Sequence, residues 1–229
     1  LTFITSGYSS SYNNNIEGNT LLQSYDYKSS ITATGGKIQM SYKPTSSLEA
    51  NVGLEYTQYR INPDEISPNS DRDAIEPINV IDDRSSESSA FGSVFYKVNN
   101  ALTLRGGLRY TQYQKIGEGR EYVFETNEAR SRESIIDTLR FEGGKVIQKY
   151  KSLEPRVSFV YRLSKSASVK GSYQKTAQFI HQLSNSVAPS PFAVWRVSNT
   201  NIRPRRTGQV AFGYFQNLRN NIFEASVAG

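Results

Sequence analysis

The chain contains a single histidine, His181, and histidine is the side chain whose ordinary pKa suits acid–base catalysis near neutral pH. Its immediate surroundings, QFIHQLSNS, contain no carboxylate that would orient the imidazole. The sequence has no cysteine, which excludes disulfides, thiolate metal ligands and cysteine nucleophiles. We therefore predict no catalytic residue and expect His181 to pack or hydrogen-bond within its loop.

Clustered carboxylates offer a second kind of chemistry, the chelation of a calcium ion. Asp71, Asp73, Asp82 and Asp83 lie in residues 61–87, a segment rich in Asp, Glu, Asn, Pro and Ser. Their spacing does not match an EF-hand loop or another recognised calcium loop. We expect solvated loop charges here, and we predict neither a metal site nor a cofactor.

Arginines at alternating positions offer a third kind, the attraction of anions. Arg105 and Arg109 lie on one face of an extended segment, and Arg156 lies on the polar face of another. In a wet channel, such side chains would line a path that attracts an anionic ligand. Arg162 and Lys170 share these faces and would line the same path. The alternative is structural, with these five cations paired to Glu49, Glu55 and Glu154, or to acidic groups of a plug inside the channel.

An aromatic pair lies in the long segment after His181. Phe192 and Trp195, close to two prolines, would stack on a ring of a bound ligand, or they would anchor this loop to the rest of the protein. The ligand-binding residues that we predict are Arg105, Arg109, Arg156, Phe192 and Trp195.

The strands that carry these residues are predicted from the alternation of apolar and polar side chains, which has a period of two residues. In LEPRVSFVYRL, residues 153–163, apolar and polar side chains alternate, and residues 167–174 repeat the scheme after a tight Ser164-Lys165-Ser166 turn. The same alternation predicts about ten strands, whose clearest examples are residues 1–12, 24–44, 48–60, 88–98, 101–114, 153–163, 167–179, 207–218 and 222–229.

The polar faces of these strands argue against a soluble sandwich. In LEANVGLEYTQYR, residues 48–60, Glu49 and Glu55 share the face opposite Leu48, Val52 and Leu54. Two carboxylates in a dry core would each cost several kcal/mol, whereas a hydrated lumen removes that penalty. Strands of roughly ten to twelve residues, apolar outward and polar inward, are typical of a transmembrane β-barrel in contact with lipid.

The connections support the same interpretation, because they alternate in length. Turns near residues 45, 99, 165 and 220 are tight, whereas those near 17, 74, 133 and 191 are long, as in outer-membrane barrels. Tyrosines at the strand ends predict two aromatic girdles. The long-loop girdle comprises Tyr56, Tyr59, Tyr110, Tyr113 and Tyr173, and the short-turn girdle comprises Tyr42, Tyr96, Tyr161 and Tyr214.

Composition agrees with a barrel. The chain has 229 residues, 37% hydrophobic, with a mean hydropathy of -0.55, and no apolar run long enough for a transmembrane helix. The net charge of +6 is spread along strands and loops, so we predict no nucleic-acid partner. Both ends fall within strand patterns, which leads us to expect a piece of a longer protein.

These segments resemble the barrel of TonB-dependent outer-membrane receptors, in particular those of the Bacteroidetes. The resemblance is carried by Leu153-Glu154-Pro155-Arg156, Tyr161-Arg162-Leu163, Ser172-Tyr173, His181-Gln182-Leu183-Ser184-Asn185-Ser186, Pro191, Trp195, Asn201-Ile202-Arg203-Pro204, Gln209-Val210-Ala211-Phe212-Gly213-Tyr214-Phe215 and Glu224-Ala225-Ser226-Val227. The hairpin of residues 89–113 is similar more loosely.

The resemblance implies a 22-stranded barrel filled by a plug, of which residues 1–229 would be a partial barrel domain without plug or TonB box. It implies energy-coupled import of a scarce siderophore, vitamin, oligosaccharide or peptide, and no enzyme. The implied partners are the TonB complex, the nutrient, outer-membrane lipid and a substrate-capturing surface lipoprotein. The alternatives are a self-contained passive porin or surface-binding barrel and, third, an outer-membrane enzyme that depends on His181.

Overall fold

The computed structural model describes residues 2–14, 25–68, 78–79, 82–127, 131, 133–183, 194–219 and 222–229. These residues form strands and turns, and none of them forms a helix long and apolar enough to cross a membrane. The predicted all-β class is therefore confirmed.

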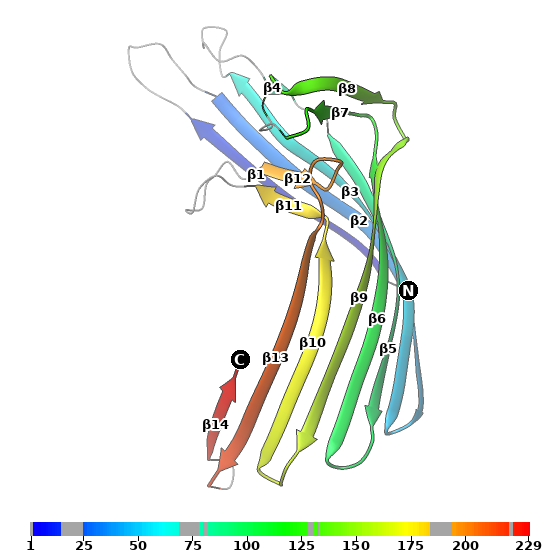
Figure 1. Ribbon diagram of the computed structural model, residues 1–229, viewed down its shortest axis with the longest axis vertical. Coiled ribbons are helices and arrows are strands. Elements are labelled where there is room, and N and C mark those ends of the chain that lie inside the picture. The colour runs from blue at the N-terminus through cyan, green and yellow to red at the C-terminus, as the bar shows by residue number, and fades with distance from the viewer. Residues whose placement is uncertain are drawn as a thin grey trace.

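One antiparallel sheet dominates the structure (Figure 1). Nine strands of this sheet follow one another in chain order and correspond to the strands predicted from the sequence. The tenth, the two-residue strand β4 (Ile78–Asn79), pairs with β3 and lies in a segment predicted as a loop. The long strands are β1 (Thr2–Asn14), β2 (Tyr25–Thr45), β3 (Leu48–Pro68), β5 (Asp83–Lys97), β6 (Leu102–Ile116), β9 (Val146–Arg162), β10 (Ala167–Gln178), β13 (Arg205–Leu218) and β14 (Phe223–Ala228).

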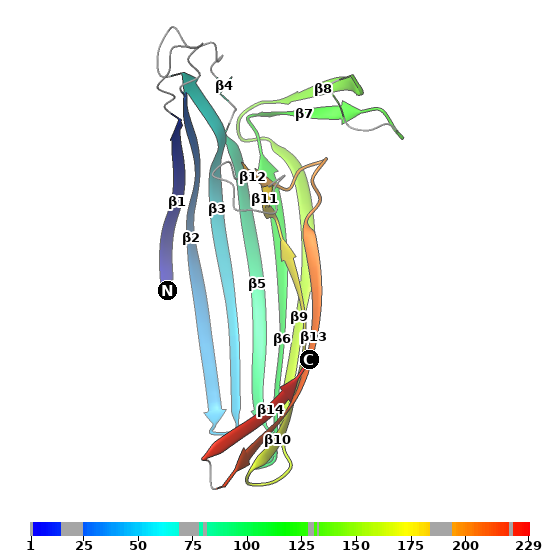
Figure 2. The ribbon, with the colours of Figure 1, turned by 90° about the vertical axis from the view of Figure 1, so that its left-hand side faces the viewer.

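The sheet is curved into an open trough, with β1 and β14 at its two edges (Figures 1 and 2). We call the concave side the inner face and the convex side the outer face. Two small hairpins lie at one end of the trough: β7 (Gly119–Phe124) with β8 (Ile135–Phe141), and β11 (Ile180–Leu183) with β12 (Val194–Val197).

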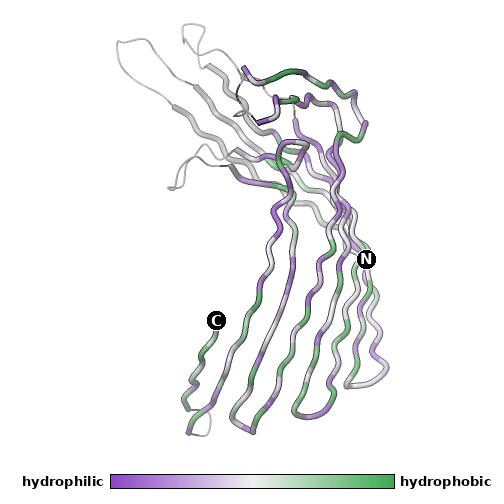
Figure 3. The backbone as a smooth tube through the Cα atoms, in the orientation of Figure 1, coloured by the Kyte–Doolittle hydropathy of each residue, from purple (hydrophilic) through white to green (hydrophobic). Residues whose placement is uncertain are grey.

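The outer face is an exposed apolar band. Along β3, Val52, Leu54 and Tyr56 are 51%, 61% and 48% exposed, and the strands on both sides repeat the pattern. Figure 3 shows hydrophobic and hydrophilic residues alternating along the strands away from the hairpin end. An exposed apolar surface of this breadth is unfavourable in water and is typical of a strand that faces lipid.

Tight turns close the strands at the end opposite the hairpins (Figure 2). Asn99 Oδ1 accepts hydrogen bonds from the backbone N–H groups of Ala101 and Leu102, both at 2.8 Å. The backbone N–H of Leu163 donates to the carbonyl of Ala167 at 2.9 Å, which closes the predicted serine-rich turn. Long connections lie at the other end, so the predicted asymmetry of the connections is confirmed.

Two predicted boundaries are wrong. β3 continues to Pro68, beyond the predicted end at residue 60, and the segment predicted as one charged loop, residues 116–150, contains β7, β8 and the first residues of β9. The strands continue past their predicted ends because the backbones of neighbouring strands still pair there. Gln114 of β6, for example, lies opposite Lys149 of β9. Beyond the apolar band both faces meet water, so the apolar–polar alternation that marks a strand in the sequence fades.

The long-loop girdle needs a correction. Tyr56, Tyr110 and Tyr173 lie on the outer face, 48%, 40% and 43% exposed, but Tyr113 is fully buried on the inner face. Tyr59 and Tyr113 are an odd number of residues beyond Tyr56 and Tyr110, and side chains alternate between faces. Both tyrosines therefore belong to the inner face. The four predicted short-turn tyrosines are exposed, consistent with the second girdle.

Close packing of rings on glycines fixes the inner wall. Gly53 lies opposite Phe91, and a Cβ atom on Gly53 would stand 2.4 Å from Phe91 Cζ and 2.6 Å from the carbonyl oxygen of Ile38. The Lys37 ammonium lies 4.8 Å from the centroid of the same ring. On the outer face, Phe159 covers Gly171 in the same way.

We expect Gly53→Ala to destabilise the full-length protein by about 1–3 kcal/mol, because the added methyl would displace Phe91 or the neighbouring strand. The matched control is Gly106→Ala, since nothing lies within 4 Å of a Cβ there, and it should change the free energy of unfolding by less than about 0.5 kcal/mol. Urea unfolding in lipid vesicles measures both. Equal effects would contradict the packing described.

Candidate functional site

A hairpin folded against the inner face forms the centre of the candidate site. The connection between β10 and β13 carries β11 and β12, which pair from Ile180 opposite Val197 to Leu183 opposite Val194. β12 lies against β2, β3 and β5, on the far side of the trough from β10 and β13 (Figures 1 and 2). The hairpin therefore occupies space inside the trough near its long-loop end.

A small apolar cluster holds the hairpin in place. Ile61 and Tyr113 of the sheet and Phe179 and Val197 of the connection are buried together, with Trp195 packed against them. The rings of Tyr113 and Phe179 are stacked, with centroids 4.8 Å apart and planes 2° from parallel. Burial of such side chains is worth about 1.5–3 kcal/mol each. These contacts are the physical reason why this segment turns inward.

Two tyrosine hydroxyls fix the backbone that follows β12. The Tyr113 hydroxyl donates to the carbonyl oxygen of Ser198 at 2.9 Å, and the Tyr150 hydroxyl donates to that of Asn199 at 2.6 Å. The N–H of Ser198 donates to the carbonyl of Phe179 at 2.7 Å. Because Ser198 is fully buried, a lost hydrogen bond at its carbonyl would leave an unsatisfied group.

A second hairpin, β7–β8, is connected to the first through polar contacts. Thr200 Oγ1 donates to Glu121 Oε2 at 2.5 Å, and Asn201 Nδ2 donates to the carbonyl of Tyr122 at 3.1 Å. Lys115 Nζ lies between Glu121 Oε1 at 2.7 Å and Asp83 Oδ1 at 3.1 Å. These contacts join two long connections, the β6–β9 and the β10–β13 connection, to each other and to strands β5 and β6.

A polar hollow of about 430 Å³ opens between these connections. Its wall carries both signs of charge, from Asp82, Asp83, Lys115, Arg120, Glu121 and Arg196. The Arg60 guanidinium lies 2.6 Å from Asp82, so the negative charge of this carboxylate is already balanced by an ion pair. The hollow is suited to a polar ligand that offers several hydrogen-bonding groups.

His181 belongs to the hairpin and is placed to support it. Its Nε2 lies 3.0 Å from Ser198 Oγ, and its backbone pairs with that of Arg196. Partial burial, and then the positive charge of Arg205, lower the pKa of His181 below its ordinary value. The imidazole is therefore neutral at neutral pH, and this geometry agrees with the hydrogen-bonding role expected from the sequence.

The predicted arginines lie on the inner wall. Arg109 reaches Glu55 at 3.0 Å and Thr111 Oγ1 at 3.3 Å, and the Thr111 hydroxyl donates to Glu154 at 3.1 Å. Arg156 lies 4.0 Å from the buried carboxylate of Glu154. These contacts form a hydrogen-bonded charge network across β3, β6 and β9. They agree with the alternative in which Arg109 and Arg156 pair with acidic side chains of the wall.

Arg105 and Lys170 contact rings of the same wall, as Lys37 contacts Phe91. The Arg105 guanidinium lies 5.6 Å from the centroid of Phe95, and Lys170 Nζ lies 4.0 Å from that of Phe215. Arg109 and Arg156, with Lys37, Phe91 and Glu154, border a hollow of about 250 Å³. The inner wall thus presents cations held against aromatic rings and carboxylates rather than a uniform positive path.

The remaining predicted residues are divided by the structure. Trp195 is half-buried against the apolar cluster, which agrees with its anchoring alternative, while Phe192 lies outside the described residues. Asp82 and Asp83 are in ion pairs, and Asp71 and Asp73 lie outside the described residues. Within the described part of the chain, no three acidic or histidine side chains gather as a metal site would require.

Four residues of the site, Tyr113, Tyr150, Lys115 and Glu121, were not predicted from the sequence. For Tyr113 a signal was present, because strand alternation counted from Tyr110 places it on the inner face. For Lys115 and Glu121 none was present, since their contact depends on how two connections fold over the sheet. The arrangement as a whole is an inner wall that the hairpins β7–β8 and β11–β12 partly cover.

Comparison with known proteins supports this architecture. A family model described as "TonB dependent receptor-like, beta-barrel" matches residues 2–229, and no curated protein matches the chain. Among solved structures, the copper transporter OprC shares 13% identity and a TM-score of 0.60 over 94% of this chain and 34% of that one.

Two further solved structures show the same fold. The FrpB iron transporter from Neisseria meningitidis has a TM-score of 0.53 at 12% identity, over 99% of this chain and 35% of that one. The Serratia marcescens hemophore receptor HasR, in complex with its hemophore HasA and heme, has a TM-score of 0.50 at 14% identity, over 98% and 39%. This chain thus spans little more than a third of their lengths. On the family match across its length, the chain belongs to the TonB-dependent receptor-like β-barrel family.

Proposed function

We propose that this chain is the barrel part of an outer-membrane receptor that imports a scarce nutrient by energy-coupled uptake. The nutrient class is a siderophore, vitamin, oligosaccharide or peptide, and the energy comes from a TonB complex acting through a plug encoded elsewhere in the protein. A surface lipoprotein that captures the nutrient is part of the proposal. The function is transport, without a catalytic site.

The observation that carries this proposal is the inward hairpin β11–β12. The chain's own hairpin is anchored inside the trough by a buried apolar cluster and by two tyrosine hydroxyls, so it occupies part of the space through which a ligand would pass. A ligand that enters from the long-loop end meets this hairpin and the polar hollow beside it. Such an arrangement supports capture followed by a gated step.

The polarity of the inner wall is a second observation in favour of a lumen that is filled by a plug. Its charged and polar groups are arranged for contact with water or with another polar surface, as in the network of Glu55, Arg109 and Glu154. The outer wall, by contrast, is apolar and exposed, which supports a position within the outer membrane. A plug domain with complementary charges would cover the inner wall without leaving buried charges unpaired.

Uptake by the full-length protein in its own bacterium tests this function. Cells with and without the receptor gene are given radiolabelled iron–siderophore, cobalamin, oligosaccharides and peptides in turn. We expect one of them to accumulate only when the receptor is present, and accumulation to fall to background when TonB is deleted. Flux that persists without TonB would indicate a passive pore and would contradict the proposal.

We expect Tyr113→Phe combined with Tyr150→Phe to loosen the hairpin, since the two substitutions remove the donors to Ser198 and Asn199. An unsatisfied buried carbonyl costs about 1–3 kcal/mol, so the Ser198 amide should exchange its hydrogen roughly tenfold faster or more. Hydrogen exchange of the full-length receptor, followed by mass spectrometry, measures this.

The control is Tyr173→Phe, the same chemical change at a tyrosine exposed on the outer face. It should leave exchange at Ser198 unchanged. If the double variant exchanged at the same rate as this control, the hydroxyls would not be what holds the hairpin.

A further inference from the structure

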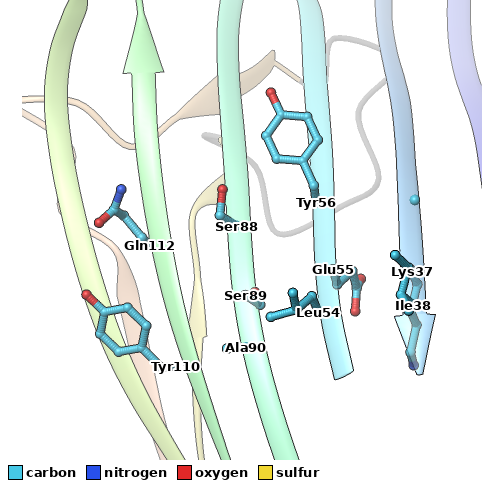
Figure 4. Close-up of a pocket in the computed structure, with 11 residues that line it drawn as sticks. Lys37, Ile38, Leu54, Glu55, Tyr56, Ser88, Ser89, Ala90, Tyr110 and Gln112 are labelled. Carbon is cyan, nitrogen blue, oxygen red and sulfur yellow. The ribbon is translucent and has the colours of Figure 1, made fainter. Parts of the chain in front are cut away.

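The long strands between β1 and β14 have a neighbour on both edges, whereas the inward hairpin has an open edge. Leu54 of β3, for example, lies between Ile38 of β2 and Ala90 of β5 (Figure 4). β11, in contrast, pairs with β12 alone among the described strands. Its other side, which we call the free edge of β11, presents backbone N–H and C=O groups that no described strand takes up.

A hydrogen bond at the base of the hairpin identifies the groups on the free edge. The N–H of Ser198 donates to the carbonyl of Phe179, so the backbone groups of Phe179 point toward β12. These groups alternate in direction along a strand, so those of Ile180 and Gln182 point away from β12. The Gln178 side-chain amide donates to the carbonyl oxygen of Ile180 at 2.7 Å. Among the described contacts, this leaves the two N–H groups of Ile180 and Gln182 and the Gln182 carbonyl on the free edge.

The free edge faces along the trough, away from the long connections. β12 lies against β2, β3 and β5, and β11 lies on the short-turn side of β12 (Figure 1). The polar hollow of about 430 Å³ is lined by Arg196 of β12 and by Asn199 just after it, and none of the described residues of β11 reaches it. The hollow and the free edge are therefore on different sides of the hairpin.

The free edge is held in a fixed position. Phe179, directly before β11, is buried in the apolar cluster, and His181 Nε2 lies 3.0 Å from Ser198 Oγ. Gln182 is exposed in the described part of the chain. An edge that is already ordered loses little conformational entropy on pairing, and an extended segment beside it gains main-chain hydrogen bonds.

The position of the free edge identifies its partner. A nutrient that enters from the long-loop end reaches the polar hollow first, whereas the free edge faces the interior of the barrel, which the proposed plug fills. A plug packed against the hairpin would bury the N–H groups of Ile180 and Gln182, and buried backbone groups without partners are costly. An extended segment of the plug would supply these partners.

We propose that an extended segment of the plug pairs with the free edge of β11 and adds a third strand to the hairpin. The plug itself belongs to the proposed function, on which this pairing rests. The new hydrogen bonds point away from β12, so the plug can detach from β11 while the β11–β12 ladder stays intact. Movement of the plug therefore exposes the Gln182 amide before it disturbs Ser198.

Hydrogen exchange of the full-length receptor, purified without nutrient and resolved to single amides by mass spectrometry, tests the pairing. We expect the Gln182 amide to exchange at least about tenfold slower than an unpaired amide. An unprotected Gln182 amide in the unaltered protein would overturn the proposal. Protection that appears only after a peptide mixture is added would also overturn it, because the third strand would then be a ligand.

Two variants separate the backbone of Gln182 from its side chain. Gln182→Pro removes the N–H that points to the plug and leaves the β11–β12 ladder, whereas Gln182→Ala removes only the side chain. We expect one short plug segment to exchange about tenfold faster in the proline variant than in the alanine variant, with the Ser198 amide equally protected in both. Equal exchange of the plug in two variants that both protect Ser198 would contradict the pairing.

Uptake by the unaltered receptor distinguishes this pairing from the proposed function. Uptake that requires TonB, together with an unprotected Gln182 amide, would contradict the strand pairing alone. Uptake that persists without TonB would contradict the proposed function and, with it, the plug on which the pairing depends.

Discussion

The structure depends on one constraint, that every strand must satisfy its backbone hydrogen bonds within the sheet while its two faces meet different surroundings. An antiparallel sheet pairs backbone groups between neighbours, so the side chains alone decide what each face can touch. Leu54 and Glu55 are adjacent in β3, yet one is exposed on the apolar face and the other pairs with Arg109 inside. The position of every other feature follows from this division.

The division into an apolar and a polar face explains what the inner face can hold. Because it is polar, it can hold a charge network, and because it is concave, it leaves room for the chain to fold back on itself. The β10–β13 connection uses that room, placing Phe179 and Val197 on Ile61 and Tyr113 and thereby forming an apolar cluster on an otherwise polar wall. Lys115 and Glu121 then join the second hairpin to the first. The two hairpins and the strands that hold them thus form one anchored assembly.

The sequence predicts the sheet well and the site only in part. Alternation is a local property, so the strands, their outer-face residues and the tight turns follow from residues close in the chain. The site depends on contacts between distant segments, such as Tyr113 with Ser198 and Lys115 with Glu121, and no short pattern encodes these. Arg109 was identified by its position, but its partner among the possible glutamates required the register of three strands.

The most direct test of the two-sided sheet is a spin-label scan of residues 48–56 of β3 in the full-length receptor in lipid vesicles. One label is placed at each position, and its accessibility to oxygen, which concentrates in lipid, is compared with that to a water-soluble nickel chelate. Even-numbered positions should favour oxygen and odd-numbered positions nickel. Accessibilities that rise and fall together, or that lack a period of two, would contradict the account.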